Sequence, residues 1–252
     1  MRYAMAVDLH RCMGCMTCVV SCQMNNGLRP GMARLSVEEL EWGRWPDGGR
    51  AALPHGCLHC DEPRCVRVCP TGASAKGDDG IVTVDGGRCI GCGVCVTACA
   101  YGARSIPGEE SCYFDAAAPA PYEAWSRVPL GVADKCDFCK DRVMRGDEPV
   151  CVRDCPASAR LFGDLDDCDS AISCFVIEEN GSFAAGRGTF YADGFLPFSA
   201  EQAIAERCFV PAAENASRSG LPQREPNPAV LGGAAAVAAA AVGGLVAYKR
   251  RH

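Results

Sequence analysis

Short apolar stretches recur along the chain and lie next to groups of cysteines. Four of them read as strands: Tyr3–Asp8, residues 80–85, residues 103–106 and residues 159–162. The second stretch follows the turn-forming pair Asp78 and Asp79 and leads to Cys89, as one strand of a hairpin would. Tyr3–Asp8 stands in the same position before Cys12. The pattern predicts a repeated unit of strand, cysteine loop, short helix and strand, and therefore an α+β fold.

The C-terminal part of the chain has a different character. Prolines mark a linker over residues 220–228, and residues 229–248 carry no charge before the basic end Lys249–His252. Twenty uncharged residues match one membrane-spanning helix, although nine alanines and four glycines give little hydrophobic drive. The basic end favours a membrane anchor with a cytoplasmic C-terminus. The alternative is a soluble tail or one that packs on a partner.

Composition narrows the functional classes. The 252 residues are 48% hydrophobic and 22% charged, as in a globular protein with a packed core. A net charge of −6 gives no electrostatic case for binding nucleic acid. Four histidines argue against a histidine-rich metal centre. The chain also has twenty cysteines, although it is too long to need a disulfide scaffold for stability.

Sixteen of the cysteines fall into four motifs. The motifs are Cys12, Cys15, Cys18 and Cys22 (first); Cys57, Cys60, Cys65 and Cys69 (second); Cys89, Cys92, Cys95 and Cys99 (third); and Cys136, Cys139, Cys151 and Cys155 (fourth). The first and third share the spacing C-x2-C-x2-C-x3-C. The second and fourth are stretched, and all four end in C-x3-C.

The compact spacing is typical of bacterial ferredoxins. There, three close thiolates bind one [4Fe–4S] cluster, and the fourth cysteine, about one helical turn later, binds another. Motifs of this kind work in pairs, so sixteen thiolates predict four [4Fe–4S] clusters. Three alternatives fit this spacing less well. A zinc site typically uses two separated cysteine pairs, not runs of four. Cysteines three residues apart on a tight loop seldom form an unstrained disulfide, and a thioredoxin-type site needs one motif, not four.

Longer stretches around the motifs resemble a known family. Residues 135–167 (KCDFCKDRVMRGDEPVCVRDCPASARLFGDLDD) are similar to the fourth motif of the four-cluster iron–sulfur subunits of complex iron–sulfur molybdoenzymes, of the dimethyl sulfoxide reductase type. Residues 57–73 (CLHCDEPRCVRVCPTGA) resemble the second motif of that family, and residues 79–104 (DGIVTVDGGRCIGCGVCVTACAYGAR) the third. The resemblance covers about residues 1–167, and the stretched spacings make it specific.

The resemblance implies how the motifs share clusters. The first and fourth motifs would hold two clusters and the second and third the other two. Four ligand sets follow: set A, Cys12, Cys15, Cys18 and Cys155; set B, Cys136, Cys139, Cys151 and Cys22; set C, Cys57, Cys60, Cys65 and Cys99; set D, Cys89, Cys92, Cys95 and Cys69.

The same pairing predicts the domain organisation. Residues 1–50 and 131–167 would form an outer ferredoxin-like unit, interrupted by an inner ferredoxin-like unit over residues 51–130. A C-terminal extension over residues 168–219, the linker over residues 220–228 and a single helix over residues 229–248 would complete the chain.

Other side chains near the motifs suggest supporting roles. Positive charge near an anionic cluster raises its potential, and eight basic residues lie close to the motifs: Arg11, Arg64, Arg67, Arg88, Arg104, Lys135, Lys140 and Arg153. For each of them, a solvated surface position is the alternative. His59, with His55 nearby, could donate a hydrogen bond to a cluster sulfur. Cys112, Cys168, Cys174 and Cys208 lie outside the motifs and read as buried free thiols, with a Cys168–Cys174 bridge as the alternative.

The expected function is electron transfer without catalysis. The chain has no nucleotide-binding fingerprint or P-loop, and the resemblance implies a molybdopterin-containing catalytic subunit as partner, with a membrane quinol-oxidising subunit as electron donor. One alternative is the equivalent subunit of a respiratory formate dehydrogenase or hydrogenase. Another is a redox-sensing regulatory or assembly protein.

The expected location follows from the tail and from the N-terminus. An anchor with a cytoplasmic C-terminus would place the clusters on the extracytoplasmic face. Residues 1–12 contain no hydrophobic signal region, so export would depend on the catalytic partner. Without the anchor, a cytoplasmic protein is expected.

Overall fold

The computed structural model describes residues 1–108 and 128–208. Its strands are β1 (Tyr3–Asp8), β2 (Leu35–Trp42), β3 (Gly49–Gly56), β4 (Ser74–Lys76), β5 (Val82–Val84), β6 (Arg160–Asp164), β7 (Ser182–Ala184) and β8 (Thr189–Ala192). Its helices are α1 (Thr17–Asn26), α2 (Arg64–Arg67), α3 (Val94–Thr97), α4 (Lys140–Val143), α5 (Val150–Arg153), α6 (Ala171–Glu178) and α7 (Ala200–Cys208). Mixed short strands and helices confirm the predicted α+β class.

The largest sheet joins the two ends of the cysteine pattern. Its strand order is β6-β1-β8-β7, with β6 antiparallel and β8 parallel to β1. Because Val7 pairs with Arg160, the strand before the first motif lies beside the strand after the fourth. The predicted strand Tyr3–Asp8 is confirmed, and the strand predicted at 159–162 is found at Arg160–Asp164.

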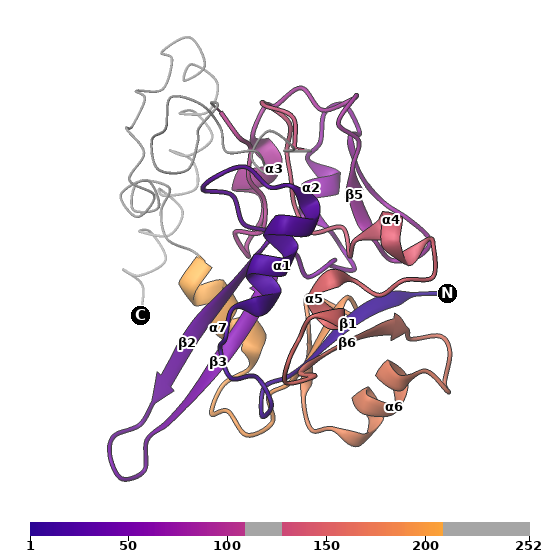
Figure 1. Ribbon diagram of the computed structural model, residues 1–252. Coiled ribbons are helices and arrows are strands. Elements are labelled where there is room, and N and C mark those ends of the chain that lie inside the picture. The colour runs from indigo at the N-terminus through magenta and orange to yellow at the C-terminus, as the bar shows by residue number, and fades with distance from the viewer. Residues whose placement is uncertain (109–127, 209–252) are drawn as a thin grey trace, which may run out of the picture. The chain divides into compact units, whose positions relative to one another are not determined.

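Strand β1 is buried on both faces, which explains its uninterrupted apolar sequence. Met5 and Val7 face the main core, whereas Ala4 and Ala6 face a second cluster that includes Ile172 of α6. Alternate side chains of a strand point to opposite faces, so small residues on one side leave room for the helix. Figure 1 shows α6 beside this sheet.

The hairpin predicted around residues 80–85 is present, but the strand predicted at residues 103–106 is not. β5 lies within the predicted range 80–85. It pairs with β4 in antiparallel register, with Ser74 opposite Val84. Residues 103–106 form no strand: the backbone groups of Ser105 and Asp134 exchange two hydrogen bonds of 3.1 and 2.8 Å as an isolated bridge. Pro107 lacks the N–H that a longer ladder would need.

Two parts of the fold had no counterpart in the sequence-based expectations. β2 and β3 form a long hairpin that extends from the rest of the molecule (Figure 1), and the predicted boundary at residue 50 falls within β3. The extension after residue 167 supplies β7 and β8 to the main sheet. Residues 1–209 cluster as one compact unit.

The predicted membrane helix cannot be compared with the structure. Residues 229–248 lie outside the described residues. Within residues 1–108 and 128–208, no helix is both long enough and apolar enough to cross a membrane.

Candidate metal centres

All four motif loops share one backbone feature. The residue before the second cysteine is left-handed in each: Gly14 (φ 71°), His59 (φ 48°), Gly91 (φ 67°) and Phe138 (φ 56°). Such a residue turns the chain sharply between neighbouring cysteines, as a loop that wraps a small object must do. At Gly91 the need for glycine is also steric, because an added Cβ would lie 2.3 Å from the carbonyl oxygen of Gly131.

A helix follows each loop and carries the third cysteine. Cys18 lies in α1, Cys65 in α2, Cys95 in α3 and Cys151 in α5. The fourth cysteine comes four residues after the third, about one helical turn further along. All four third cysteines are buried. The local structure therefore separates the last thiol of each motif from the first three.

Two of the predicted ligand sets line cavities of their own. Cys12, Cys15, Cys18 and Cys155 line one cavity, together with Arg160. Cys69, Cys89, Cys92 and Cys95 line another. In each cavity, three cysteines of one motif meet the last cysteine of a motif distant in the sequence.

The other two sets are adjacent as well. Cys60, Cys65 and Cys99 line a third cavity, and Cys57 lies close enough to raise the pKa of Cys60. In the fourth set, Cys151 and Cys139 lie close enough to Cys22 to raise its pKa, and Cys22 and Cys151 do the same at Cys136. The structure thus brings together the members of all four predicted sets.

The thiols are spaced for something larger than a single ion. A tetrahedral zinc, with Zn–S bonds of about 2.3 Å, would hold its sulfurs about 3.8 Å apart. In the described part of the chain, only Asp167, Cys168 and Asp169 bring three ligand atoms all within 4.8 Å of one another. No motif does so, and none of the described cysteines forms a disulfide. Sets of four thiols at wider spacing suit a cubane cluster.

Burial and hydrogen bonding set the protonation of these thiols. Burial, reinforced by neighbouring thiolates, raises the pKa of Cys22 and of Cys60 to about 12. At Cys69 the backbone N–H of Ser74, 3.5 Å from Sγ, is the main cause that lowers the pKa to about 7. Buried thiols hold their protons, so iron must displace them as it binds.

Backbone N–H groups point at other motif sulfurs. The N–H of Ala133 lies 3.4 Å from Cys89 Sγ, that of Phe138 lies 3.5 Å from Cys136 Sγ, and that of Ala159 lies 3.3 Å from Cys155 Sγ. Hydrogen bonds to cluster sulfurs stabilise the reduced state. This donor pattern and the all-thiol sets fit iron–sulfur clusters.

The basic residues divide into surface and buried groups. Five of the eight predicted cations are exposed: Arg11, Arg64, Arg67, Arg88 and Arg153. Lys140 pairs with Asp79 at 2.8 Å, whereas Arg104 and Lys135 are buried. Sequence reasoning missed Arg160, which is also buried. The signal was present, because Arg104 and Arg160 each follow the last cysteine of a motif by five residues.

His59 lies at the contact between the second and fourth motifs. Its Nδ1 accepts a hydrogen bond of 3.0 Å from the N–H of Val82, and its ring stacks on Phe138 with centroids 3.7 Å apart. Its Nε2 has no hydrogen-bond partner in the described chain, so the predicted bond to a cluster sulfur stays a prediction. His55 lies 3.0 Å from Ser36 Oγ.

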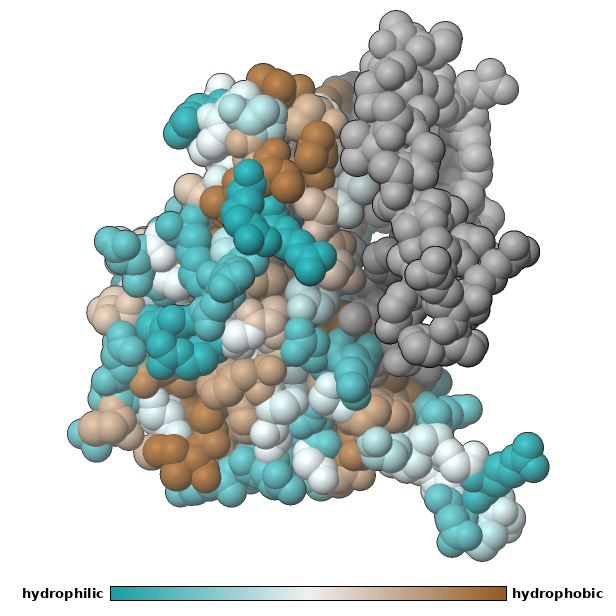
Figure 2. Space-filling model, turned by 180° about the vertical axis from the view of Figure 1, so that it is seen from behind, coloured by the Kyte–Doolittle hydropathy of each residue, from teal (hydrophilic) through white to brown (hydrophobic). Residues whose placement is uncertain are grey.

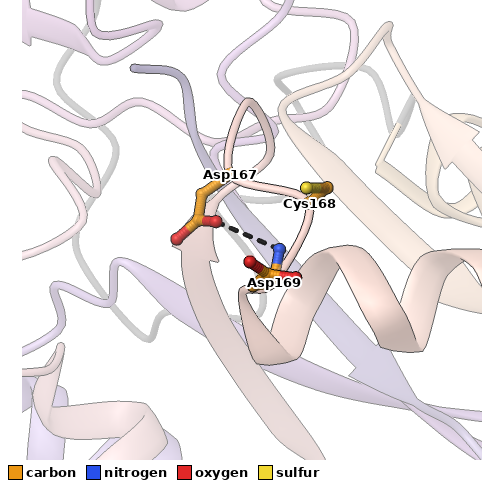
Figure 3. Close-up of side chains that lie close together, drawn as sticks. All are labelled: Asp167, Cys168 and Asp169. Atoms are coloured by element: carbon orange, nitrogen blue, oxygen red, sulfur yellow. Dashed lines mark hydrogen bonds between the residues drawn. The ribbon is translucent and has the colours of Figure 1, made fainter.

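The cysteines outside the motifs were partly misjudged. Cys168 and Cys174 are exposed and unbridged, not buried, because they lie on a surface loop and on the outer side of α6. Cys112 lies outside the described residues. Figure 3 shows Cys168 between Asp167 and Asp169, where an Asp167 carboxylate oxygen accepts a 3.0 Å hydrogen bond from the Asp169 N–H. This is a local turn at the surface, and we assign no site to it.

Comparison with known families agrees with the cluster chemistry. The 4Fe-4S dicluster domain matches residues 50–113 and 109–165, and the 4Fe-4S binding domain matches residues 9–25. The chain is 37% identical, over 70% of its length and 71% of the relative, to a dimethyl sulfoxide reductase iron–sulfur subunit of Halobacterium salinarum. The chain belongs to this family of iron–sulfur electron-transfer subunits.

Other members share the same level of similarity. The thiosulfate reductase electron transfer subunit of Salmonella typhi is 39% identical, over 66% of this chain and 78% of the relative. A tetrathionate reductase subunit of Salmonella typhimurium is 40% identical over 69% of this chain, which spans 63% of that relative. The predictions of [4Fe–4S] clusters and of a non-catalytic electron-transfer subunit are thereby confirmed.

Proposed function

We propose that this iron–sulfur subunit is a four-cluster electron wire between two partners. Sets A, B, C and D would each hold one [4Fe–4S] cluster, in that spatial order. The bound clusters supply one-electron transfer, and the chain fixes their sequence and their surroundings. One partner is a molybdopterin-containing catalytic subunit of the dimethyl sulfoxide reductase type, and the other is a membrane module that oxidises quinol.

The proposal rests on one observation: cysteines of each ligand set lie near cysteines of another set. Arg160 lines the cavity of set A together with Cys18 and forms a side-chain hydrogen bond with Cys151 of set B. Burial is the main cause that raises the pKa of Cys136 in set B, and Cys57 of set C contributes last, after Cys22, Asp137 and Cys151. Arg104 faces Cys65 of set C and Cys95 of set D. Each set therefore neighbours the next, and A and D stand at the two ends.

The two end sets are also the ones that reach the surface. Among the described motif cysteines, only Cys15 of set A and Cys92 of set D are exposed. The apolar residues beside them, Met13 and Ile90, are each 67% exposed. Apolar residues also reach the surface in separate patches between polar ones on the face drawn in Figure 2. Exposed apolar side chains beside a redox site suit docking of a partner.

The location is proposed on the tail sequence. Residues 229–248 would anchor the subunit, with the basic end in the cytoplasm and the clusters on the extracytoplasmic face. Clusters are assembled in a reducing compartment, so the folded subunit would be exported together with the catalytic partner. Deleting residues 229–252 should release the complex from membranes, and a complex that stays bound would assign the anchor to another subunit.

A serine substitution inside the wire tests the function. Cys136→Ser removes a buried ligand of set B and should block quinol-driven turnover, while copurification with the catalytic subunit is retained. The matched control, Cys174→Ser, removes an exposed thiol outside the motifs and should change neither. Turnover by a direct artificial donor to the catalytic subunit should survive in both variants. Normal quinol-driven turnover in Cys136→Ser would contradict electron transfer through set B.

A further inference from the structure

Two buried arginines occupy equivalent positions in the repeated pattern. Arg104 ends the segment CAYGAR and Arg160 ends CPASAR, each five residues after the last cysteine of a motif. Their exposed fractions are 5% and 7%. Arginine is almost never buried unless its charge is matched. Each side chain therefore needs an anionic neighbour.

Arg160 lines the same cavity as the four cysteines of set A. Burial alone would lower its pKa, whereas negative charge at Cys151 and Cys18, which these residues would carry as cluster ligands, raises it. Its Nε and Nη1 have no hydrogen-bond partner in the described chain, and the Arg160 side chain forms a hydrogen bond with the Cys151 side chain. Cys18 belongs to set A and Cys151 to set B, so this cation lies beside both.

Arg104 repeats the arrangement in the other pair of sets. Its hydrogen-bond partner Ser74 lines the cavity of set D. Burial would lower the pKa of Arg104, and negative charge at Cys65 and Cys95, which these residues would carry as cluster ligands, offsets this effect. Its Nη1 donates a 2.8 Å hydrogen bond to Ser74 Oγ, whereas Nε and Nη2 have no partner among the described residues. Cys65 belongs to set C and Cys95 to set D.

A third arginine, which is half-buried, shows how carboxylates of the protein match such a charge. Arg34 forms ion pairs with Asp134 at 2.6 Å and with Asp137 at 3.2 Å. Arg104 and Arg160 have no such carboxylates in the described chain, and a buried, unpaired guanidinium is costly. An anionic group held by the surrounding thiolates would satisfy both the charge and the free N–H donors.

We propose that Arg160 is the shared counter-ion of clusters A and B, and Arg104 that of clusters C and D. The inference rests on the proposed four-cluster function and adds a role for residues that are not ligands. Reduction adds one electron to an already anionic cluster, so a fixed cation beside two clusters favours the reduced state of both. Each arginine would raise the potentials of its own pair and leave the other pair unchanged.

Redox titration of the purified complex, followed by EPR, tests this directly. The wild type should show four one-electron reductions. Arg160→Gln should shift two of them to lower potential, and Arg104→Gln should shift the other two. The double variant should shift all four. Iron content measured on the same samples shows whether the clusters are retained.

Charge-conserving and exposed variants complete the test. Arg160→Lys and Arg104→Lys keep the charge and should recover most of each shift. If a glutamine variant loses its clusters, the lysine variant still tests the assignment. Lysine places its charge at a different position, so any change in potential should be confined to the two reductions of the cluster pair beside that residue. Arg153→Gln and Arg67→Gln remove exposed charges near the same motifs and should move none, since solvent screens them.

Two results would overturn the assignment. One is a glutamine variant with full iron content and unchanged potentials. The other is a shift that crosses the pairs, with Arg160→Gln moving the steps that Arg104→Gln also moves. Fewer than four reductions in the wild type would instead contradict the four-cluster function, so the two failures can be told apart.

Discussion

The compact and the stretched motif loops use the same backbone turn with different side chains. In the compact loops the left-handed residue is glycine, Gly14 or Gly91, and the following cysteine is exposed. In the stretched loops it is His59 or Phe138, and these two rings stack on each other in the interior. The compact loops therefore sit at the two ends of the proposed wire, and the stretched loops meet in its middle.

The largest effect should come from crowding a compact loop. Gly91→Ala adds a Cβ that would lie 2.3 Å from the Gly131 carbonyl oxygen, in addition to a left-handed cost of about 1–2 kcal/mol. We expect loss of cluster D and of about four irons per chain. Gly93→Ala is the matched control, because it has φ 74° and nothing within 4 Å, and it should keep its iron. Equal iron loss in both variants would contradict the steric account.

The contact between the two stretched loops, where His59 stacks on Phe138, should be the next most sensitive to substitution. Phe138→Ala removes a buried ring, a change that typically costs about 3–5 kcal/mol, and should lower the melting temperature of the anaerobic complex clearly. His59→Phe keeps the stack but leaves the Val82 N–H without its acceptor, at about 1–3 kcal/mol. A larger loss for His59→Phe than for Phe138→Ala would show that the stack does not hold the junction.

Charges at the exposed ends should affect partners and leave the fold intact. Met13→Asp and Ile90→Asp place carboxylates beside Cys15 and Cys92, on side chains that are 67% exposed. We expect full iron content, with weaker binding of a different partner in each variant, measured by copurification. If both variants lose the same partner, the two ends do not serve two partners.

The smallest effect is expected at the cysteines outside the motifs. Cys168→Ser and Cys174→Ser change exposed, unbridged thiols, so stability should stay within about 0.5 kcal/mol and iron content should not change. Thermal melting with and without reductant provides the measurement. A reductant-dependent drop in the parent that disappears in both variants would reveal a bridge.

Spacing predicted the chemistry well because three of the four cysteines in each set come from one motif. Three thiols per loop are placed by a few residues, and Tyr3–Asp8 could be read as a strand from its apolar run alone. The β2–β3 hairpin and the addition of β8 beside β1 depend on contacts between distant segments, which no local pattern encodes. Arg160 was missed although it has the same offset from a motif cysteine as Arg104, because its burial depends on tertiary packing. The strand predicted at 103–106 failed because Pro107 ends the pairing after one bridge.

This subunit is proposed to carry four redox-active clusters in two pairs. The most direct test is iron analysis combined with stepwise reduction of the complex, purified anaerobically through this chain. The account predicts about sixteen irons per chain and four electrons taken up, with molybdenum or tungsten in a companion subunit. About eight irons and two electrons would contradict the four-site wire, and an iron-free, colourless chain would contradict the cluster chemistry altogether.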